Sequence, residues 1–399
     1  MLSEVYLDNW QIPGELRLML ELSLRKAQQI PGGLDWTYFD ELVSQHRLQP
    51  LLIRGIRQYG AELPGELAKY SAMQGKFMAS SMARIQALHA VNRAFADAGI
   101  RLISMKGPLL SMELYGDPSL RTSRDLDVMV AQEDLPRAGE ILRGMGYVLE
   151  EHLNTATPRR RKFYQRIEQE KHEVYNRGEI CLELHWKSDY QTDESFDELW
   201  LRREERMLMG MPIAVLGAQD RYPALFTHAA EHGFMRLRWL LDLYELQRKP
   251  GFDWGALHSR MAQQEIGEIL ILALLVMHRL GLPGLQDTAW EGFRLTREST
   301  GIRVEADNEA ELQKAAALCD RVLPLLVQEV KPTAGEWKEY DRLLPQAVYG
   351  RSKWQWLLAF LGPSEHEYEL IDLPDSLFWL YFLIRPFCWL GRKLFGGKK

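Results

Sequence analysis

The spacing of apolar residues changes twice along this chain of 399 residues, and each change predicts a change of fold. In residues 15–30 and 72–97, apolar side chains recur at three- and four-residue spacing with few breakers, which is typical of amphipathic helices. Between about 100 and 190, short apolar runs bounded by Gly, Pro and Asn replace that spacing, and helical spacing returns after about 195. We therefore expect an α+β fold in which a small α/β core with a mixed sheet lies between two helical regions.

Within this core, the apolar runs at 100–105 and 126–130 predict two strands. A short helix is expected at 109–115, between them. The Asn-Arg-Gly turn within residues 174–186 predicts an antiparallel hairpin. The predicted regions are an N-terminal helical region (1–97), the α/β core (98–192), a second helical domain (193–345) and a basic, aromatic C-terminal helical tail (346–399).

Composition excludes several classes of protein. The formal charge of −6 does not provide the extended basic surface that duplex DNA requires, so no duplex DNA partner is expected. The cysteines Cys181, Cys319 and Cys388 are odd in number and far apart, which argues against a disulfide framework and suits a reducing compartment. Residues 1–13 contain acidic side chains and no long apolar run, so we expect no secretory signal and a cytoplasmic location.

The C-terminal residues 376–399 contain five basic side chains and no acidic one. Their apolar run at 377–384 is followed by Arg385-Pro386, so it is far shorter than the ~20 apolar residues of a membrane-spanning helix. Two alternatives remain for this tail. It packs on the protein's own core, or it lies on a membrane surface, where aromatic and basic side chains are favoured.

A pair of acidic residues stands on the second predicted strand. In the stretch Asp125-Leu126-Asp127-Val128, alternation puts both aspartates on one face and the apolar residues on the other. Neighbouring carboxylates repel each other unless a cation lies between them. Glu183, which alternates with apolar residues in the predicted hairpin, is the natural third acid. Such oxygen ligands suit Mg²⁺ or Mn²⁺, and two of these ions can promote displacement at a phosphorus atom.

A longer series of residues accompanies these acids. It comprises Lys106-Gly107, Leu114-Tyr115-Gly116-Asp117-Pro118, Arg121, Gly146-Tyr147 and Leu184-His185-Trp186, with flanking His46, Pro50-Leu51-Leu52, His228, His232, Arg238-Trp239-Leu240-Leu241-Asp242 and Arg385-Pro386. The series resembles the DNA polymerase β-like nucleotidyltransferase superfamily, and in particular its uncharacterised nucleotidyltransferase family. The resemblance implies a polymerase β-like core in which Asp125, Asp127 and Glu183 are catalytic and bind the metal ions.

The same resemblance implies that Gly107 approaches a nucleoside triphosphate through its backbone amide. The wider superfamily has a Gly-Ser pair at this turn, whereas this chain has Lys106-Gly107 and a longer gap before Asp125. We expect Lys106 to act as a phosphate-binding cation. The departure also keeps open the alternative of a catalytically impaired nucleotide-binding or partner-binding protein on the same fold.

Two arginines immediately before the acids complete the predicted nucleotide site. Arg121 and Arg124 would neutralise charge on the triphosphate or the leaving pyrophosphate, because electrostatic stabilisation dominates phosphoryl transfer. The structural alternative is that they form ion pairs with Asp117, Asp125 or Asp127.

For three histidines, the sequence leaves open a ligand-binding role and a structural role. His185 is two residues beyond the third acid and so faces the same cleft, where it binds nucleotide or serves as a structural histidine. The stretch His228-Ala229-Ala230-Glu231-His232 matches an inverted zinc-protease pattern, but no third ligand is evident. A helix lining the nucleotide or acceptor cleft and a structural polar cluster are the better alternatives.

The basic run at 159–162 is a solvated loop or steers an anionic acceptor.

These patterns predict a Mg²⁺-dependent transfer of a nucleoside monophosphate from a nucleoside triphosphate to an unidentified acceptor, with release of pyrophosphate. The helical domain at 193–345 would form the acceptor wall. A protein, an RNA end, a sugar and a small molecule all remain open as acceptors, because a fold does not specify its substrate. The base of the nucleotide is equally open.

Overall fold

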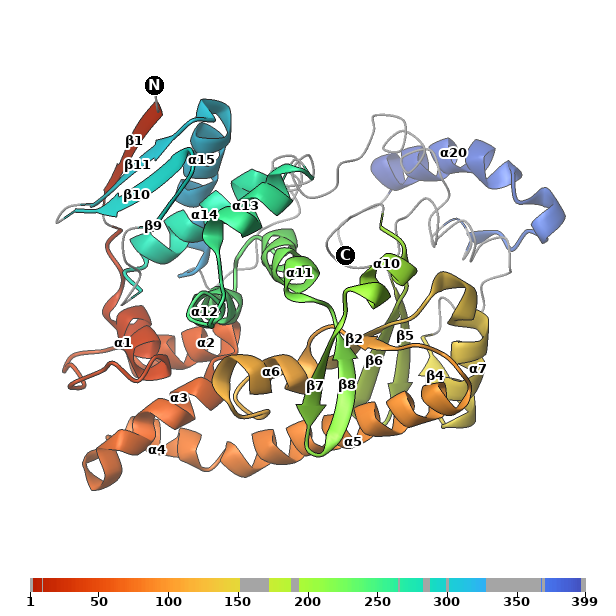
Figure 1. Cartoon of the computed structure of the whole chain (residues 1–399), viewed down its shortest axis with the longest axis horizontal. Coiled ribbons are helices and arrows are strands. Elements are labelled where there is room, and N and C mark those ends of the chain that lie inside the picture. Colours follow the sequence, from red (N-terminus) through yellow and green to blue (C-terminus); the bar gives the residue numbers. More distant parts are fainter. Residues whose placement is uncertain are drawn as a thin grey trace.

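The computed structural model describes most of the chain, and Figure 1 shows its arrangement. The described residues are 3–8, 10–150, 172–187, 194–264, 266–282, 288–298, 301–327, 367 and 370–395. The basic run at 159–162 lies outside them, as does much of the predicted tail region 346–399. Within these described ranges, no helix combines the length and the apolar character needed to cross a bilayer.

A seven-stranded mixed sheet forms the core (Figure 1). In spatial order its strands are β4 (Val148–Leu149), β5 (His172–Arg177), β6 (Ile180–His185), β3 (Asp125–Met129), β2 (Ile103–Ser104), β8 (Met211–Val215) and β7 (Glu204–Leu208). β3 runs parallel to β6, and β2 runs parallel to β8, while the other neighbours are antiparallel. The predicted strands appear as β2 and β3 and the predicted hairpin as β5 and β6, which confirms the α+β core.

One face of this sheet is apolar and is covered by helices. Val128 of β3 and Leu184 of β6 are fully buried in a core that they share with α5 (Gln74–Asp97) and α7 (Leu135–Gly144). Because side chains alternate along a strand, the acidic residues of β3 lie on the opposite face. The short helix α10 (Phe196–Leu201) covers part of that opposite face.

Helices from both sides of the core pack together beside the sheet (Figure 1). They are α1 (Gly14–Ser23), α2 (Trp36–His46), α3 (Gln49–Ile56), α4 (Gly65–Ser71), α6 (Gly107–Tyr115), α11 (Ala218–Glu231), α12 (Leu237–Leu246), α13 (Trp254–Ala262), α14 (Gly267–Arg279) and α15 (Glu309–Leu325). Short 3₁₀ segments are η1 (Arg57–Glu62), η2 (Gln132–Asp134) and η3 (Asp375–Leu377). Residues of α1 and α14 are buried in the same apolar core, so the N-terminal and C-terminal helical regions stabilise each other.

A second, four-stranded sheet corrects the expectation that the flanking regions are helical throughout. Its order is β1 (Ser3–Asp8), β11 (Gly301–Ala306), β10 (Phe293–Arg297) and β9 (Thr288–Trp290), all antiparallel. Similarly, β7 and β8 form a hairpin within the predicted second helical domain. The reason is physical: Ser3 of β1 pairs with Ala306 of β11, far along the chain, and no local pattern reports such a pairing.

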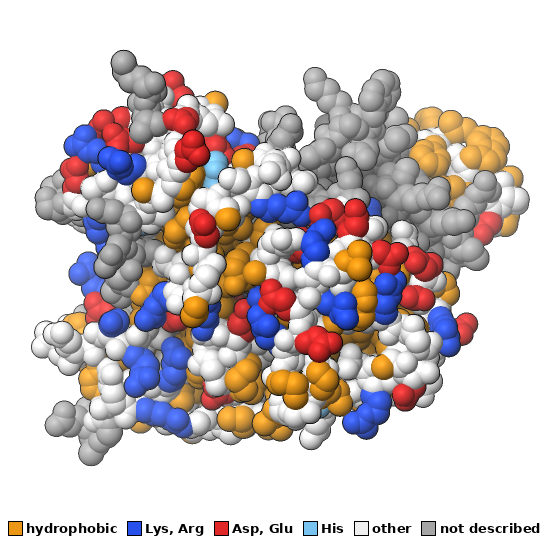
Figure 2. All heavy atoms as spheres, in the orientation of Figure 1, with side chains coloured by type: hydrophobic (Ala, Val, Ile, Leu, Met, Phe, Trp, Pro, Cys, Tyr) orange, Lys and Arg blue, Asp and Glu red, His pale blue; other side chains and the backbone are white. Residues whose placement is uncertain are grey.

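The described part of the tail ends in the helix α20 (Leu380–Phe395). Arg385 donates a hydrogen bond from Nη1 to Oε2 of Glu367 over 2.8 Å. Trp379 is 57% exposed and Phe387 is 75% exposed. Figure 2 shows hydrophobic side chains gathered over this helix. The helix therefore presents apolar side chains to solvent.

Candidate active site

Adjacent parallel strands bring the three predicted acids onto one face of the sheet. Asp127 of β3 is paired directly with Glu183 of β6, and Asp125 is paired with Cys181. Asp127 is only 5% exposed, whereas Asp125 and Glu183 lie partly open to solvent. Their common face is the one without α5 and α7, and on that side Asp125 and Glu183 are partly exposed while Asp127 is buried.

The acids concentrate negative charge in a partly buried place. Burial raises the pKa of the Glu183 carboxyl, a hydrogen bond with His185 lowers it, and the charge of Asp127 raises it, so the pKa lies above its usual range. Burial, and then the charges of Glu183 and Asp125, raise the pKa of the Cys181 thiol to about 11, which keeps it protonated. Carboxylates held so close are compatible when a cation lies between them. The donor set therefore fits a divalent cation such as Mg²⁺ or Mn²⁺.

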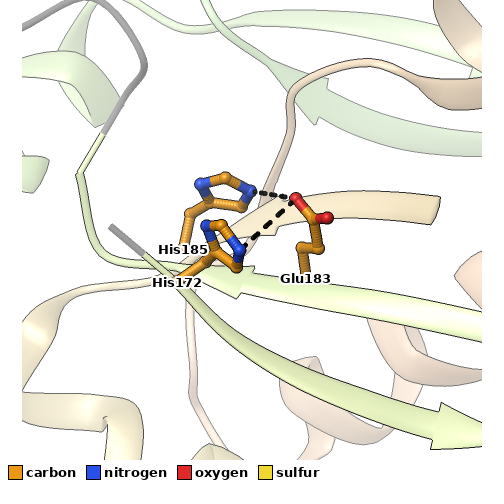
Figure 3. Close-up of side chains that lie close together, drawn as sticks. All are labelled: His172, Glu183 and His185. Atoms are coloured by element: carbon orange, nitrogen blue, oxygen red, sulfur yellow. Dashed lines mark hydrogen bonds and ion pairs between the residues drawn. The ribbon is translucent and has the colours of Figure 1, made fainter. Parts of the chain in front are cut away.

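Two histidines face the same carboxylate (Figure 3). Nε2 of His185 lies 3.3 Å from Oε2 of Glu183 and 3.6 Å from Oδ1 of Asp127. Nε2 of His172 lies 3.9 Å from that same Glu183 oxygen. We call His172, Glu183 and His185 the imidazole–carboxylate cluster. His185 thus lies at the acids, as expected. His172 was not predicted from the sequence, where its only signal is its place across the hairpin from His185.

The turn between β2 and α6 lies against the acidic strand. Gly107 has a φ of +73°, and a Cβ at this position would lie 4.0 Å from the carbonyl oxygen of Asp125. Glycine adopts this backbone conformation without strain, whereas a residue with a Cβ would be strained at this position. The Lys106 ammonium lies 2.9 Å from Nδ1 of His228 on α11 and is buried. The first backbone N–H groups of α6 therefore begin beside the acids, a position that suits phosphate oxygens.

Three arginines from separate parts of the chain lie near Asp125. Arg124 directly precedes it, Arg47 caps the end of α2, and Arg236 directly precedes α12. Burial lowers the pKa of Arg236, and the charge of Arg124 lowers it further, while Asp125 raises it. Burial and the charges of Arg236 and Arg124 lower the pKa of Arg47 to about 10. Cations that repel one another in this way attract a polyanion. The sequence predicted a phosphate-binding role for Arg124 but not for Arg47 or Arg236.

A buried histidine holds two of these arginines together. The backbone N–H of Leu237 donates to Nδ1 of His46 over 3.2 Å, and Nε2 of His46 lies 2.9 Å from the carbonyl oxygen of Leu326. Because Nδ1 accepts, the proton of the neutral ring is on Nε2, which donates to that carbonyl. Burial lowers the pKa of His46 to about 4. Arg47 and Arg236 are the chain neighbours of His46 and Leu237, so this bond positions them.

Arg121 has a partner that the sequence did not suggest. Its Nε donates to Oδ2 of Asp242 over 2.7 Å, and both side chains are 3% exposed. The Tyr115 hydroxyl donates to Oδ1 of the same aspartate over 2.8 Å. Burial lowers the pKa of Arg121, but the charge of Asp242 and the hydrogen bond to it, together with Tyr115 and Asp127, raise it by more, so the pKa lies above its usual value. The ion pair therefore involves Asp242, and the predicted contact with the triphosphate stays a prediction.

The pair formed by His228 and His232 has surroundings that disfavour a metal ion. The Lys106 ammonium next to His228 would repel a cation. His232 stacks on Trp239, with ring centroids 4.8 Å apart. Within the part of the chain that the structure describes, the three residues of the imidazole–carboxylate cluster have the donor spacing of a metal site.

Comparisons with known proteins give one family match and two weak structural similarities. The model of a family described as "Uncharacterised nucleotidyltransferase" matches residues 32–281, more than half of the chain. A solution structure of the antibiotic-resistance factor ANT(2'')-Ia aligns with 46% of this chain and 92% of its own, at 12% identity and a TM-score of 0.34. A crystal structure of ANT(2'')-Ia in complex with adenylyl-2''-tobramycin covers 48% and 95%, at 13% identity and a TM-score of 0.27. The comparison with curated proteins finds no match.

Proposed function

The chain belongs to the uncharacterised nucleotidyltransferase family, and from this premise we propose that it transfers a nucleoside monophosphate from a nucleoside triphosphate to an acceptor. An acceptor hydroxyl or phosphate would attack the α-phosphorus, a new P–O bond would form, and pyrophosphate would leave. The acceptor classes expected from the sequence stay predictions, as does the cytoplasmic location.

The direct pairing of Asp127 with Glu183, with Asp125 on the same face, is the observation that carries the proposal. These three side chains would hold Mg²⁺ or Mn²⁺ as a pair of ions. Such ions, when bound, orient the reacting oxygens and neutralise charge on the transferring phosphorus centre. Burial of Asp127 keeps its carboxylate fixed by the sheet, so the protein need not reorganise this ligand during the reaction.

The arginines near Asp125 support triphosphate binding on the same side of the sheet. Arg47, Arg124 and Arg236 would each contribute a guanidinium to phosphate oxygens, because repulsion among them is relieved by a polyanion. The backbone N–H groups of Gly107 and Leu109 at the start of α6 would supply further donors, whereas Pro108 between them has none.

Equilibrium binding of each nucleoside triphosphate with Mg²⁺ tests the proposal, followed by a pyrophosphate-release assay. We expect Asp127→Asn to abolish turnover without unfolding the protein. Glu179→Gln, in the turn of the same hairpin as Glu183, is the matched control and should retain activity. Turnover that persists in Asp127→Asn would refute the assignment. Metal-dependent nucleotide binding without pyrophosphate release, across a panel of acceptors, would favour the catalytically impaired alternative.

A second proposal concerns the tail, which we infer contacts an anionic membrane surface. Its exposed Trp379, Leu383 and Phe387 would enter the lipid interface. Arg385 pairs with Glu367, and the sequence carries four more basic residues after it, which would add attraction for anionic headgroups: Arg392, Lys393, Lys398 and Lys399. Co-sedimentation with phosphatidylserine-containing vesicles tests this. Binding should be lost on deletion of 376–399 and weakened in Phe387→Ser, and it should be weaker on neutral vesicles. Equal binding by the truncated chain would refute the contact.

A further inference from the structure

We propose that the imidazole–carboxylate cluster is a mixed nitrogen and oxygen site for a divalent transition-metal ion of the Zn²⁺ or Co²⁺ type, in preference to Mg²⁺. The proposed transfer reaction needs only hard cations bound by carboxylates. This inference therefore adds a preference for a transition metal on the side of the candidate active site that holds Glu183. It rests on the proposed function for its place in the reaction, whereas the metal site can be tested without any nucleotide.

The distances within the cluster suit a shared ion. Ligand atoms about 2.0–2.1 Å from a tetrahedral Zn²⁺ lie about 3.3–3.4 Å from one another. Oε2 of Glu183 lies 3.3 Å from Nε2 of His185 and 3.9 Å from Nε2 of His172. All three ligand atoms lie within 4.8 Å of one another. A small inward rotation of the side chains would therefore bring all three into coordination distance of one ion.

Strand pairing makes this geometry a property of the backbone. His172 and His185 are directly opposite each other across the β5–β6 hairpin, and their ring centroids are 4.7 Å apart. Glu183 is two residues before His185, so its side chain is on the same face. Figure 3 shows both imidazoles presenting Nε2 to one oxygen of Glu183. A regular hairpin thus supplies three ligands without any special loop.

The chemistry of the donors sets the preference for a transition metal. Imidazole nitrogen suits Zn²⁺, Co²⁺, Ni²⁺ and Cu²⁺, whereas Mg²⁺ prefers oxygen donors and retains its waters. Oδ1 of Asp127 lies 3.6 Å from Nε2 of His185 and is the fourth donor at hand. Two carboxylates near two imidazoles would neutralise a divalent ion.

The second histidine pair of the chain offers a contrast. His228 and His232 have ring centroids 4.7 Å apart, as His172 and His185 do. However, the cation next to His228 is Lys106, so that pair carries positive charge where the cluster carries a carboxylate. The distinction is electrostatic, because the spacing of the two pairs is the same.

Metal binding by the full chain, stripped with a chelator, tests the proposal. We would titrate Zn²⁺ by calorimetry with excess Mg²⁺ present, and record the visible absorption of Co²⁺ as a report on nitrogen ligation. His172→Asn is the main variant because the His172 side chain is 36% exposed and its loss should not unfold the protein. The matched control is His258→Asn. Nε2 of His258 lies 3.5 Å from Oε1 of Glu311, so this variant also breaks a histidine–carboxylate pair, but one with a single imidazole. Thermal unfolding of each variant confirms its fold.

We expect one Zn²⁺ per chain in the presence of Mg²⁺, an affinity at least about 100-fold weaker in His172→Asn, and no change in His258→Asn. Zn²⁺ binding that Mg²⁺ displaces at similar concentration, or that His172→Asn leaves unchanged, would overturn the proposal. Nucleotide binding with Mg²⁺ is measured separately on the same samples. Zn²⁺ binding without nucleotide binding would refute the proposed function alone, and nucleotide binding without Zn²⁺ binding would refute the metal site alone.

Discussion

Acidification should destabilise this protein through one residue, His46. The ring is fully buried and neutral, with Nδ1 accepting from Leu237 and Nε2 donating to Leu326. Protonation of Nδ1 would remove the acceptor and put a second proton against the Leu237 N–H. The perturbation is therefore a fall in pH, and the matched variant is His46→Gln, which keeps a polar side chain that does not titrate.

The size of the effect follows from the two pKa values of His46. Burial lowers the pKa of His46 from 6.5 to about 4 in the folded protein. Since one pKa unit corresponds to about 1.4 kcal/mol, this difference corresponds to about 3 kcal/mol. The unfolded chain binds the proton first, so this stability is fully present above pH 6.5, is lost as the pH falls toward 4, and changes no further below it.

Urea denaturation at pH 7.5, 6, 5 and 4 measures the effect. Other groups titrate too, so the quantity of interest is the difference in slope between wild type and His46→Gln. We expect the wild-type free energy of unfolding to fall by about 3 kcal/mol more than that of His46→Gln across this range. Parallel pH profiles would refute the assignment of a depressed pKa to His46.

Three further predictions concern single contacts. Asp242→Asn leaves the buried Arg121 cation without its carboxylate and should lower the free energy of unfolding by about 3–5 kcal/mol in urea denaturation; a loss below about 1 kcal/mol would contradict a buried ion pair. Gly107→Ala imposes a Cβ at a φ of +73° and should lower stability by about 1–2 kcal/mol, with weaker nucleotide binding by calorimetry; an unchanged Tm would contradict the strain. Arg236→Gln should weaken triphosphate binding about tenfold. It should leave stability unchanged, because its neighbours are also cations. The control Arg248→Gln should change neither triphosphate binding nor stability.

Local sequence was sufficient for four strands of the core sheet, β2, β3, β5 and β6. Alternation of apolar and acidic residues specified β3, and the Asn-Arg-Gly turn specified the β5–β6 hairpin. Both signals act within a few residues, which is why they can be read from a single sequence. The four-stranded sheet could not be predicted in the same way, because β1 at residues 3–8 pairs with β11 at residues 301–306. Its six residues become a strand only when that partner is present.

The candidate site likewise has features that the sequence alone determined and features that depend on the tertiary structure. Asp125 and Asp127 share a face because alternation along one strand requires it, and the sequence alone determined that. The register that sets Asp127 against Glu183 depended on how two separate strands pair. The assembly of Arg47 with Arg236 depended on a hydrogen bond to a buried histidine between distant helices.

The sequence by itself therefore determined the chemistry available to this protein: three carboxylates on strands, a glycine at a tight turn and an acidic net charge. Only the tertiary structure decided which groups meet. It paired Arg121 with Asp242, and it brought His172 to Glu183. The physical reason is that periodicity fixes the direction of a side chain relative to its own strand or helix, whereas contacts between elements depend on packing over the whole chain.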